Sequence, residues 1–288
     1  MTVGYMSGQH VIHNWNWLNR LARNKESIQL NIIDLGIGAE QIGEIISQCK
    51  LSNENVVCVG VHKRGSGSSE RHSIALNQVL SAITADTSDI NILSDADCYT
   101  VAKDWDLLVR KVLSISDCIG TTYENIGGFS SGSGKKQTYK RLPNCTWFAM
   151  APGPKWNQLD CTPDLHNESR LSKEDAAMYN LPSDNVLLRD AGWKIPRFIK
   201  DNGLKYTVLT HEKPSQNSKV LAGLSDYHEE YQLGGVPVLV HQRGASKHAF
   251  RFGKLSEGFL KATDKWLEKI EKREATIDDI TFVSKMIE

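Results

Sequence analysis

The sequence has no excess charge of either sign, because 34 lysine and arginine residues balance 34 aspartate and glutamate residues. A protein that binds nucleic acid mainly by neutralising phosphates carries a basic excess, so any such contact here is expected to be local. Long hydrophobic runs are also absent, and the first residues lack the basic and then apolar pattern of a signal peptide. We therefore expect a cytoplasmic protein without stable membrane insertion.

Paired cysteine motifs are missing as well. The six cysteines are scattered, with no C-x-x-C motif and no histidine pair at zinc-finger spacing, which argues against structural zinc. In a chain of this size without a signal peptide, reduced thiols are expected. The hydrophobic content of 40% and the charged content of 24% are typical of an ordinary globular protein and exclude disordered and fibrous classes.

Short apolar runs alternate with amphipathic stretches through the first part of the chain, which is typical of β-α-β units. Strands are expected at residues 2–6, 29–35, 55–61 and 89–93, and helices at 11–23, 39–49 and 73–85. Together they predict an α/β protein with a Rossmann-type mixed, mainly parallel sheet flanked by helices. A helical pattern from Ser256 onward predicts a helical C-terminal tail.

Two aspartates, Asp95 and Asp97, follow the strand expected at 89–93, where the sequence reads ILSDADCY. Residues two apart in an extended segment point to the same side. In open α/β sheets, ligands bind beyond the carboxyl ends of the strands. Paired carboxylates suit Mg²⁺ or Mn²⁺ that shares its other positions with water and a diphosphate. The alternative interpretation is a solvated turn, in which aspartate is common.

The aspartates belong to a series of short motifs that resembles a known family. Ile33-Asp34-Leu35-Gly36, Ala75-Leu76-Asn77 and Asp95-Ala96-Asp97 stand in the order of the V-D-x-G, A-x-N and D-x-D motifs of GT-A fold glycosyltransferases, especially the large inverting family 2 type. The resemblance implies a GT-A-like fold. It further implies a nucleotide-sugar-binding half at 1–110, an acceptor-binding and catalytic half at 111–253, and a helical tail at 254–288.

The resemblance also implies residues that contact the nucleotide. Ser7 and Gly8 would approach the nucleoside through their backbone, and Asp34 would accept hydrogen bonds from the base or ribose. Arg71 lies in the loop where the family often has a basic residue near the nucleotide. A local helix cap at Asp34 and a solvated surface position at Arg71 are the structural alternatives.

The same comparison implies a metal centre. Asp95 would face the ribose or a metal-bound water, and Asp97 would ligate the Mn²⁺ or Mg²⁺ that bridges the diphosphate. His241, after the apolar run VPVLV, resembles the late histidine that completes this site in many GT-A enzymes, and Arg243 in the following loop could close on phosphates. His211 is the competing histidine, and a purely structural histidine is the other alternative.

The segment from Ser183 to Lys194, SDNVLLRDAGWK, resembles the part of the family that carries the catalytic base. Asp184 would deprotonate the acceptor hydroxyl. The family usually has two acids in succession, whereas Ser183 precedes Asp184 here, and an N-cap of a helix at 184–190 is the alternative role. The reserve candidates for the base are Asp190, Glu174 and Asp175.

The activity implied by the resemblance is metal-dependent transfer of a sugar from a nucleotide diphosphate sugar to an acceptor hydroxyl, by direct displacement with inversion. The family resemblance favours a UDP-sugar as the donor, with guanosine and thymidine diphosphate sugars as alternatives. The acceptor could be a glycan, a lipid-linked sugar, a small molecule or a hydroxylated nucleobase. Two other functions stay open: a nucleotidyltransferase that makes a nucleotide sugar, for which GYMSGQH is a poor phosphate loop, and a non-catalytic carbohydrate- or nucleic-acid-binding module.

Overall fold

The computed structural model describes residues 2–3, 8–34, 37–61, 73–78, 80, 90–122, 141–151, 155–161, 172–180, 192–214, 217–243, 245–272 and 280–287. Helices and strands alternate from β1 to β3, later strands also follow one another directly, and the strands form three sheets, so the α/β class is confirmed. The chain divides into two compact units. Unit 1 contains Met1–Lys63, Ser94–Val112 and Leu209–Phe282, and unit 2 contains Arg64–Leu93, Leu113–Val208 and Val283–Glu288.

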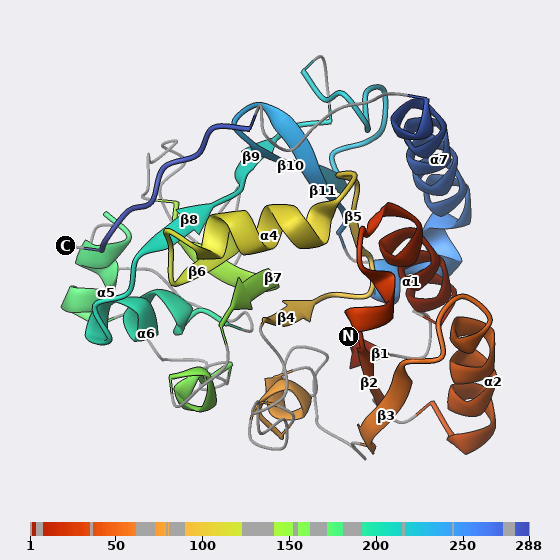
Figure 1. Ribbon diagram of the computed structural model, residues 1–288, viewed down its shortest axis with the longest axis horizontal. Coiled ribbons are helices and arrows are strands. Elements are labelled where there is room, and N and C mark those ends of the chain that lie inside the picture. Colours follow the sequence, from red (N-terminus) through yellow and green to blue (C-terminus); the bar gives the residue numbers. More distant parts are fainter. Residues whose placement is uncertain are drawn as a thin grey trace. The chain divides into compact units, whose positions relative to one another are not determined.

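Unit 1 begins with a parallel sheet of the order β1-β2-β3 (Figure 1). Its elements are β1 (Thr2–Val3), α1 (Gly8–Leu21), the short 3-10 helix η1 (Lys25–Ser27), β2 (Leu30–Asp34), α2 (Ala39–Lys50) and β3 (Val56–Val61). The buried residues of α1 recur every three or four positions, which gives the helix one continuous face to pack. The β-α-β order predicted for this part of the sequence is therefore confirmed.

A second sheet of unit 1 is antiparallel and has the order β5-β11-β10-β9. The strands are β5 (Cys98–Thr100), β9 (Thr210–Glu212), β10 (His228–Leu233) and β11 (Val236–Gln242). Gly234 and Gly235 join β10 to β11 with φ angles of +56° and +78°. Both values lie in the left-handed region that a two-residue hairpin turn requires, which explains the glycine pair.

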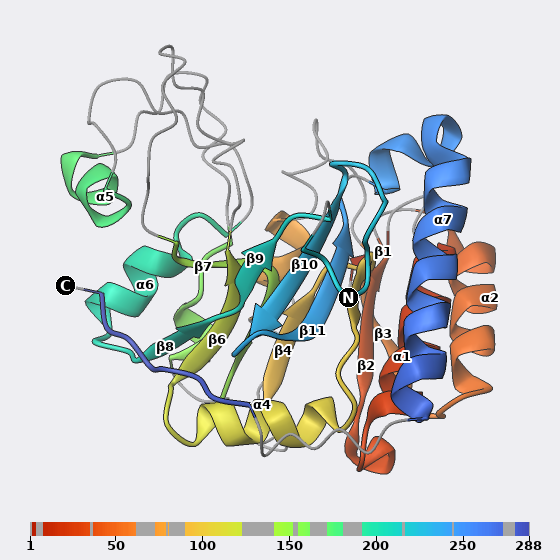
Figure 2. The same cartoon turned by 90° about the horizontal axis from the view of Figure 1, so that it is seen from above.

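Two further helices belong wholly or mainly to unit 1, α4 (Trp105–Leu113) and α7 (Ala245–Glu271). Figure 2 shows α7 running beside α1. Phe259 of α7 is 0% exposed. Its ring contacts the ring of Tyr99 edge-on, with 5.3 Å between the ring centroids, and stacks on the ring of His228, with 5.4 Å between the centroids. Burying an aromatic ring of this size contributes a few kcal/mol, so this contact anchors α7 on the antiparallel sheet.

Unit 2 is built around a mixed sheet of the order β4-β7-β6-β8. Its strands are β4 (Asn91–Ser94), β6 (Cys118–Thr122), β7 (Pro143–Met150) and β8 (Tyr206–Val208), accompanied by η2 (Trp156–Gln158), α5 (Lys173–Met178) and α6 (Ile195–Asp201). β6 pairs antiparallel with β7 and parallel with β8. The helix α6 packs on β7, and its residues Ile195 and Ile199 are both 0% exposed.

The structure differs from the predicted architecture in two respects. The described strands form three separate sheets, and many of their pairings are antiparallel, so they do not make one mainly parallel sheet. Hairpin connections such as Gly234-Gly235 produce the antiparallel pairs. The late helix begins at Ala245 rather than near Ser256, and the described residues after it, 280–287, are not helical. Within the described residues, no helix combines the length and the apolar character needed to cross a membrane.

Candidate metal centre

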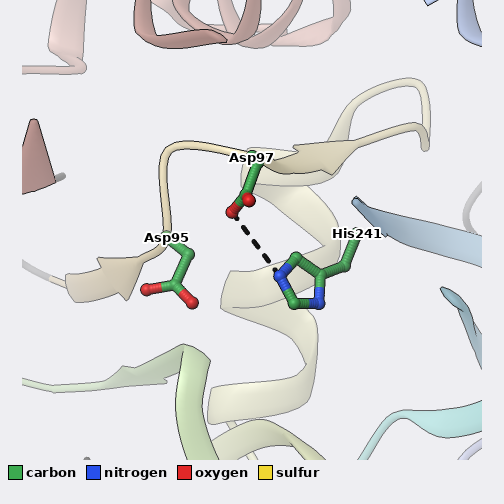
Figure 3. A group of neighbouring side chains, drawn as sticks. All are labelled: Asp95, Asp97 and His241. Atoms are coloured by element: carbon green, nitrogen blue, oxygen red, sulfur yellow. Dashed lines mark ion pairs between the residues drawn. The ribbon is translucent and has the colours of Figure 1, made fainter. Parts of the chain in front are cut away.

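The turn between β4 and β5 carries Asp95 and Asp97. β4 ends at Ser94 and β5 begins at Cys98, so the aspartates occupy a tight reversal that the Cys98 N–H closes by donating to the Asp95 carbonyl at 3.1 Å. One oxygen of each carboxylate and one ring nitrogen of His241 lie within 4.8 Å of one another. Figure 3 shows the three side chains turned toward a shared space. The structure therefore brings together the three residues predicted as metal ligands.

Strand pairing delivers His241 to this position. On β11, His241 is the register partner of Cys98 on β5, and the Gln242 N–H donates to the Asp97 carbonyl at 3.0 Å. The Nε2 atom of His241 lies 3.5 Å from Oδ1 of Asp97. His211 lies on β9, where its Nε2 is 3.8 Å from Oε1 of Glu229, and it does not belong to the group of side chains within 4.8 Å. Between the two candidate histidines, the geometry selects His241.

A buried asparagine of α1 holds the aspartate turn. The Nδ2 group of Asn14 donates to the carbonyls of Ala96 at 3.2 Å and Cys98 at 2.8 Å, and the residue is 0% exposed. Sequence reasoning missed this contact. The available signal was a polar residue on the buried face of an amphipathic helix, but nothing in the pattern says which backbone groups such a residue meets.

Glu229 on β10 lies next to the imidazole of His241. Its Oε2 atom lies 2.9 Å from Nδ1 of His241 and accepts a hydrogen bond from the Tyr231 hydroxyl at 2.7 Å, while Oε1 lies 3.4 Å from Nε of Arg243. Burial by itself would raise the pKa of Glu229, but the hydrogen bonds and positive charges of these neighbours lower the pKa to about 2. The carboxylate is therefore ionised throughout the physiological range.

His241 lies between two carboxylates, those of Asp97 and Glu229. Burial would lower its pKa, yet hydrogen bonding and attraction to both carboxylates raise the pKa to about 10. The pKa of Asp97 is lowered, because the contact with His241 outweighs the effect of burial. Without a bound metal, the imidazole is therefore protonated at neutral pH. Its positive charge lies beside Asp97, at a position that would also stabilise a metal cation.

The chemistry of these side chains fits a divalent cation. Carboxylates are the ligands preferred by Mg²⁺ and Mn²⁺, and imidazole is acceptable to Mn²⁺ beside them. Ligands about 2.1 Å from an octahedral ion lie about 3 Å from their neighbours. The 3.5 Å between Nε2 of His241 and Oδ1 of Asp97 is close to this spacing. Three protein ligands leave further positions for water or phosphate oxygens.

The residues predicted to bind the nucleoside have local structural roles where they are described. Asp34 ends β2, is 1% exposed, and accepts a hydrogen bond at Oδ1 from the Ile37 N–H at 2.8 Å. Gly8 is the first residue of α1, and a Cβ there would lie 2.8 Å from Cδ1 of Ile45 on α2. Gly8 thus lies at the contact between α1 and α2. Ser7 and Arg71 lie outside the described residues.

The predicted bases are only partly described. Asp184 and Asp190 lie outside the described residues. In unit 2, Asp175 accepts a hydrogen bond from Arg197 at 2.7 Å and is 7% exposed, so its carboxylate is engaged in holding α5 to α6. The side chain of Glu174 is 82% exposed and also lies near Arg197, at 3.6 Å. Neither reserve candidate stands in a setting that favours proton abstraction.

Asn77 and Lys194, which lie in segments that resemble the family, both contact Asp160, an aspartate that the sequence analysis did not identify. Asp160 accepts hydrogen bonds from Asn77, in the A-L-N motif, at 3.1 Å and from Lys194, the last residue of the segment SDNVLLRDAGWK, at 2.6 Å. All three belong to unit 2. The contact explains structurally why an asparagine and a lysine stand in these motifs.

Comparison of the chain with protein-family models, with curated proteins and with solved structures found no match.

Proposed function

We propose that this chain is a divalent-metal-dependent glycosyltransferase of the GT-A fold type, which moves a sugar from a nucleotide diphosphate sugar to an acceptor hydroxyl. The observation that carries the proposal is the grouping of Asp95, Asp97 and His241 within 4.8 Å. These ligands come from a turn after one strand and from a strand far along the chain, so the grouping is a product of the fold.

The setting of the group supports the proposal. The chain runs through β1, α1, β2, α2 and β3 before β4 leads into the aspartate turn, and β1, β2 and β3 are parallel. β4 belongs to the separate mixed sheet of unit 2, and Asp95 directly follows its carboxyl end, the end of a strand at which α/β proteins commonly bind ligands. A cation held by two carboxylates and an imidazole is suited to bind a diphosphate.

The proposed chemistry divides between a metal and the protein. When bound, Mn²⁺ or Mg²⁺ would neutralise the charge that develops on the departing nucleoside diphosphate. Asp95, Asp97 and His241 would hold it. Arg243, whose side chain is 40% exposed beside Glu229, adds a cation that can contact phosphate oxygens. Asp184 is the proposed base that takes the proton of the acceptor hydroxyl, so that direct displacement inverts the anomeric centre.

The resemblance assigns a UDP-sugar as the first donor to test, followed by guanosine and thymidine diphosphate sugars. The acceptor classes to test are a glycan, a lipid-linked sugar, a small molecule and a hydroxylated nucleobase. Because transferases of this kind release some sugar to water, donor hydrolysis can be assayed before the acceptor is identified. This assay needs only the full chain, a donor and a metal.

The test is release of nucleoside diphosphate from each donor sugar with Mn²⁺ or with chelator. We expect one donor to be hydrolysed only with Mn²⁺, and Asp97→Asn to lower that rate at least about a hundredfold, because the cation that would stabilise the departing diphosphate loses a carboxylate ligand. Asp264→Asn, the same change at a side chain that is 55% exposed on α7, should retain the rate.

Other outcomes would replace the proposal. Pyrophosphate release from a nucleoside triphosphate and a sugar phosphate would identify a nucleotidyltransferase. Donor binding without any metal-dependent turnover, in the presence of each acceptor class, would identify a binding module. Hydrolysis unaffected by Asp97→Asn would remove Asp97 from the site.

A further inference from the structure

Strand register places a glutamate against the proposed histidine ligand. Glu229 on β10 is the register partner of His241 on β11. Directly opposite residues of an antiparallel pair project from the same face of a sheet, so their side chains meet. Glu229 is 4% exposed and His241 is 8% exposed. The contact between Glu229 and His241 is therefore buried and set by the strand register.

The carboxylate of Glu229 is engaged at both oxygens. Oε2 meets Nδ1 of His241 at 2.9 Å and the Tyr231 hydroxyl at 2.7 Å, and Oε1 faces Nε of Arg243 at 3.4 Å. Tyr231 lies two residues along the same strand, on the same face. Tyr231 and Arg243 thus hold the carboxylate in place behind the imidazole. Glu229 does not belong to the group of three ligands that lie within 4.8 Å of one another.

This contact decides which ring nitrogen can bind an ion. A nitrogen that donates its proton to a carboxylate has no lone pair to offer, so Nδ1 of His241 is committed to Glu229. Nε2 is the other ring nitrogen, and it is the atom that lies 3.5 Å from Oδ1 of Asp97. A hydrogen bond that the other ring nitrogen donates to a carboxylate also makes a ligating imidazole more basic and fixes its ring plane.

We propose that Glu229 is a positioning residue of the metal centre, which accepts the Nδ1 proton of His241 and so presents Nε2 to the ion held by Asp95 and Asp97. The inference rests on the metal site of the proposed function. It does not depend on which nucleotide, sugar or acceptor the protein uses.

The experiment is a Mn²⁺ titration of the full chain, in which the electron paramagnetic resonance signal of free Mn²⁺ gives the Kd. Glu229→Gln should weaken Mn²⁺ binding about ten- to a hundredfold, as for other partners of ligating histidines. The matched control is Glu230→Gln. Glu230 is the next residue of β10 and is 0% exposed, but its carboxylate accepts hydrogen bonds from Ser218, Val220 and Gln232 instead. Its variant should bind Mn²⁺ with the original Kd.

A double-mutant cycle separates positioning from a merely structural role. If Glu229 acts through His241, Glu229→Gln should cause no further loss of Mn²⁺ affinity in a His241→Ala chain. An equal loss in both backgrounds would overturn the inference. So would unchanged binding by Glu229→Gln, or an absence of Mn²⁺ binding by the unaltered chain.

A measurement on the unaltered chain covers the case in which Glu229→Gln does not fold. With Zn²⁺, a diamagnetic ion that accepts both imidazole and carboxylate ligands, bound at neutral pH, the histidine nitrogen-15 spectrum should show His241 protonated at Nδ1 and unprotonated at Nε2. A proton on Nε2 would overturn the inference. If Mn²⁺ binding depends on Glu229 but no donor is turned over, the inference stands and the proposed transferase fails. If turnover requires Mn²⁺ but Glu229→Gln does not change Mn²⁺ binding, the proposed transferase stands and the inference about Glu229 fails.

Discussion

At the scale of single residues, the centre is organised by charge. Asp97 and Glu229 flank the imidazole of His241, and their attraction more than offsets the cost of burying it. A proton on His241 and a divalent cation would therefore compete for the same electrostatic position. The two states of the site differ in which positive charge neutralises the carboxylates.

This competition predicts a pH dependence of metal binding. The pKa of His241 is about 10, so the imidazole must lose its Nε2 proton before that atom can ligate an ion at neutral pH. Below this pKa, raising the pH by one unit lowers the proton concentration tenfold, so the Mn²⁺ affinity should rise by up to about tenfold. The check is the Mn²⁺ Kd at pH 6, 7 and 8, with proton release measured by calorimetry in two buffers.

The control for this experiment is His241→Gln, which removes the titrating group and should flatten the dependence. An affinity that is constant from pH 6 to 8 in the unaltered chain would contradict the account. It would mean that His241 is neutral in the metal-free protein or is not a ligand.

Sequence analysis singled out the three side chains that the structure groups, but not the residues that contact them. Asp95 and Asp97 could be identified because an aspartate pair after an apolar strand is a local pattern, and His241 because the family resemblance implies a late histidine after an apolar run. Glu229 could not, because its contact depends on the register between β10 and β11, which sequence periodicity does not give. Asn14 was missed for a similar reason, since its partners lie on a distant turn.

At the scale of elements, α1 stabilises the turn that carries the aspartates. Asn14→Ala would leave the carbonyls of Ala96 and Cys98 without this donor in a buried setting, which costs about 1–3 kcal/mol for each unsatisfied group. We expect a lower free energy of unfolding and also weaker Mn²⁺ binding, because the turn is no longer fixed. Urea unfolding and Mn²⁺ titration measure the two effects.

Asn19→Ala is the matched control on the same helix. Asn19 is 6% exposed, but its side chain donates to the Trp15 carbonyl and accepts from Asn53, away from the aspartate turn. Its loss should lower stability without changing the Mn²⁺ Kd. If Asn14→Ala also left the Kd unchanged, the turn would not need α1 for its binding geometry.

The elements also show where hydropathy patterns succeed and fail. The strands β2 and β3 and the helices α1 and α2 were predicted because their apolar residues follow simple periods. β10 was not identified, because its sequence HEEYQL is largely polar although all six residues are buried. The carboxylates of Glu229 and Glu230 accept hydrogen bonds from Tyr231, Gln232 and the loop residue Ser218, so burial there does not require apolar side chains.

At the scale of the whole molecule, the compact units do not follow chain order. Unit 1 is assembled from three separate segments, and the proposed ligands come from its second and third segments. The pairing of β5 with β11 joins those segments and completes the site. A sequence read from one end to the other shows no signal for such a pairing, so the predicted division at residues 110 and 253 could only be sequential.

The central claim is that one ion touches both the protein and a diphosphate. Electron–nuclear double resonance of the chain with Mn²⁺ and UDP tests it directly. We predict a nitrogen coupling from an imidazole and phosphorus couplings on the same ion, with the nitrogen coupling lost in His241→Ala. Phosphorus couplings without the nitrogen coupling in the unaltered chain would show that the Mn²⁺–UDP complex does not use His241, and would contradict the account.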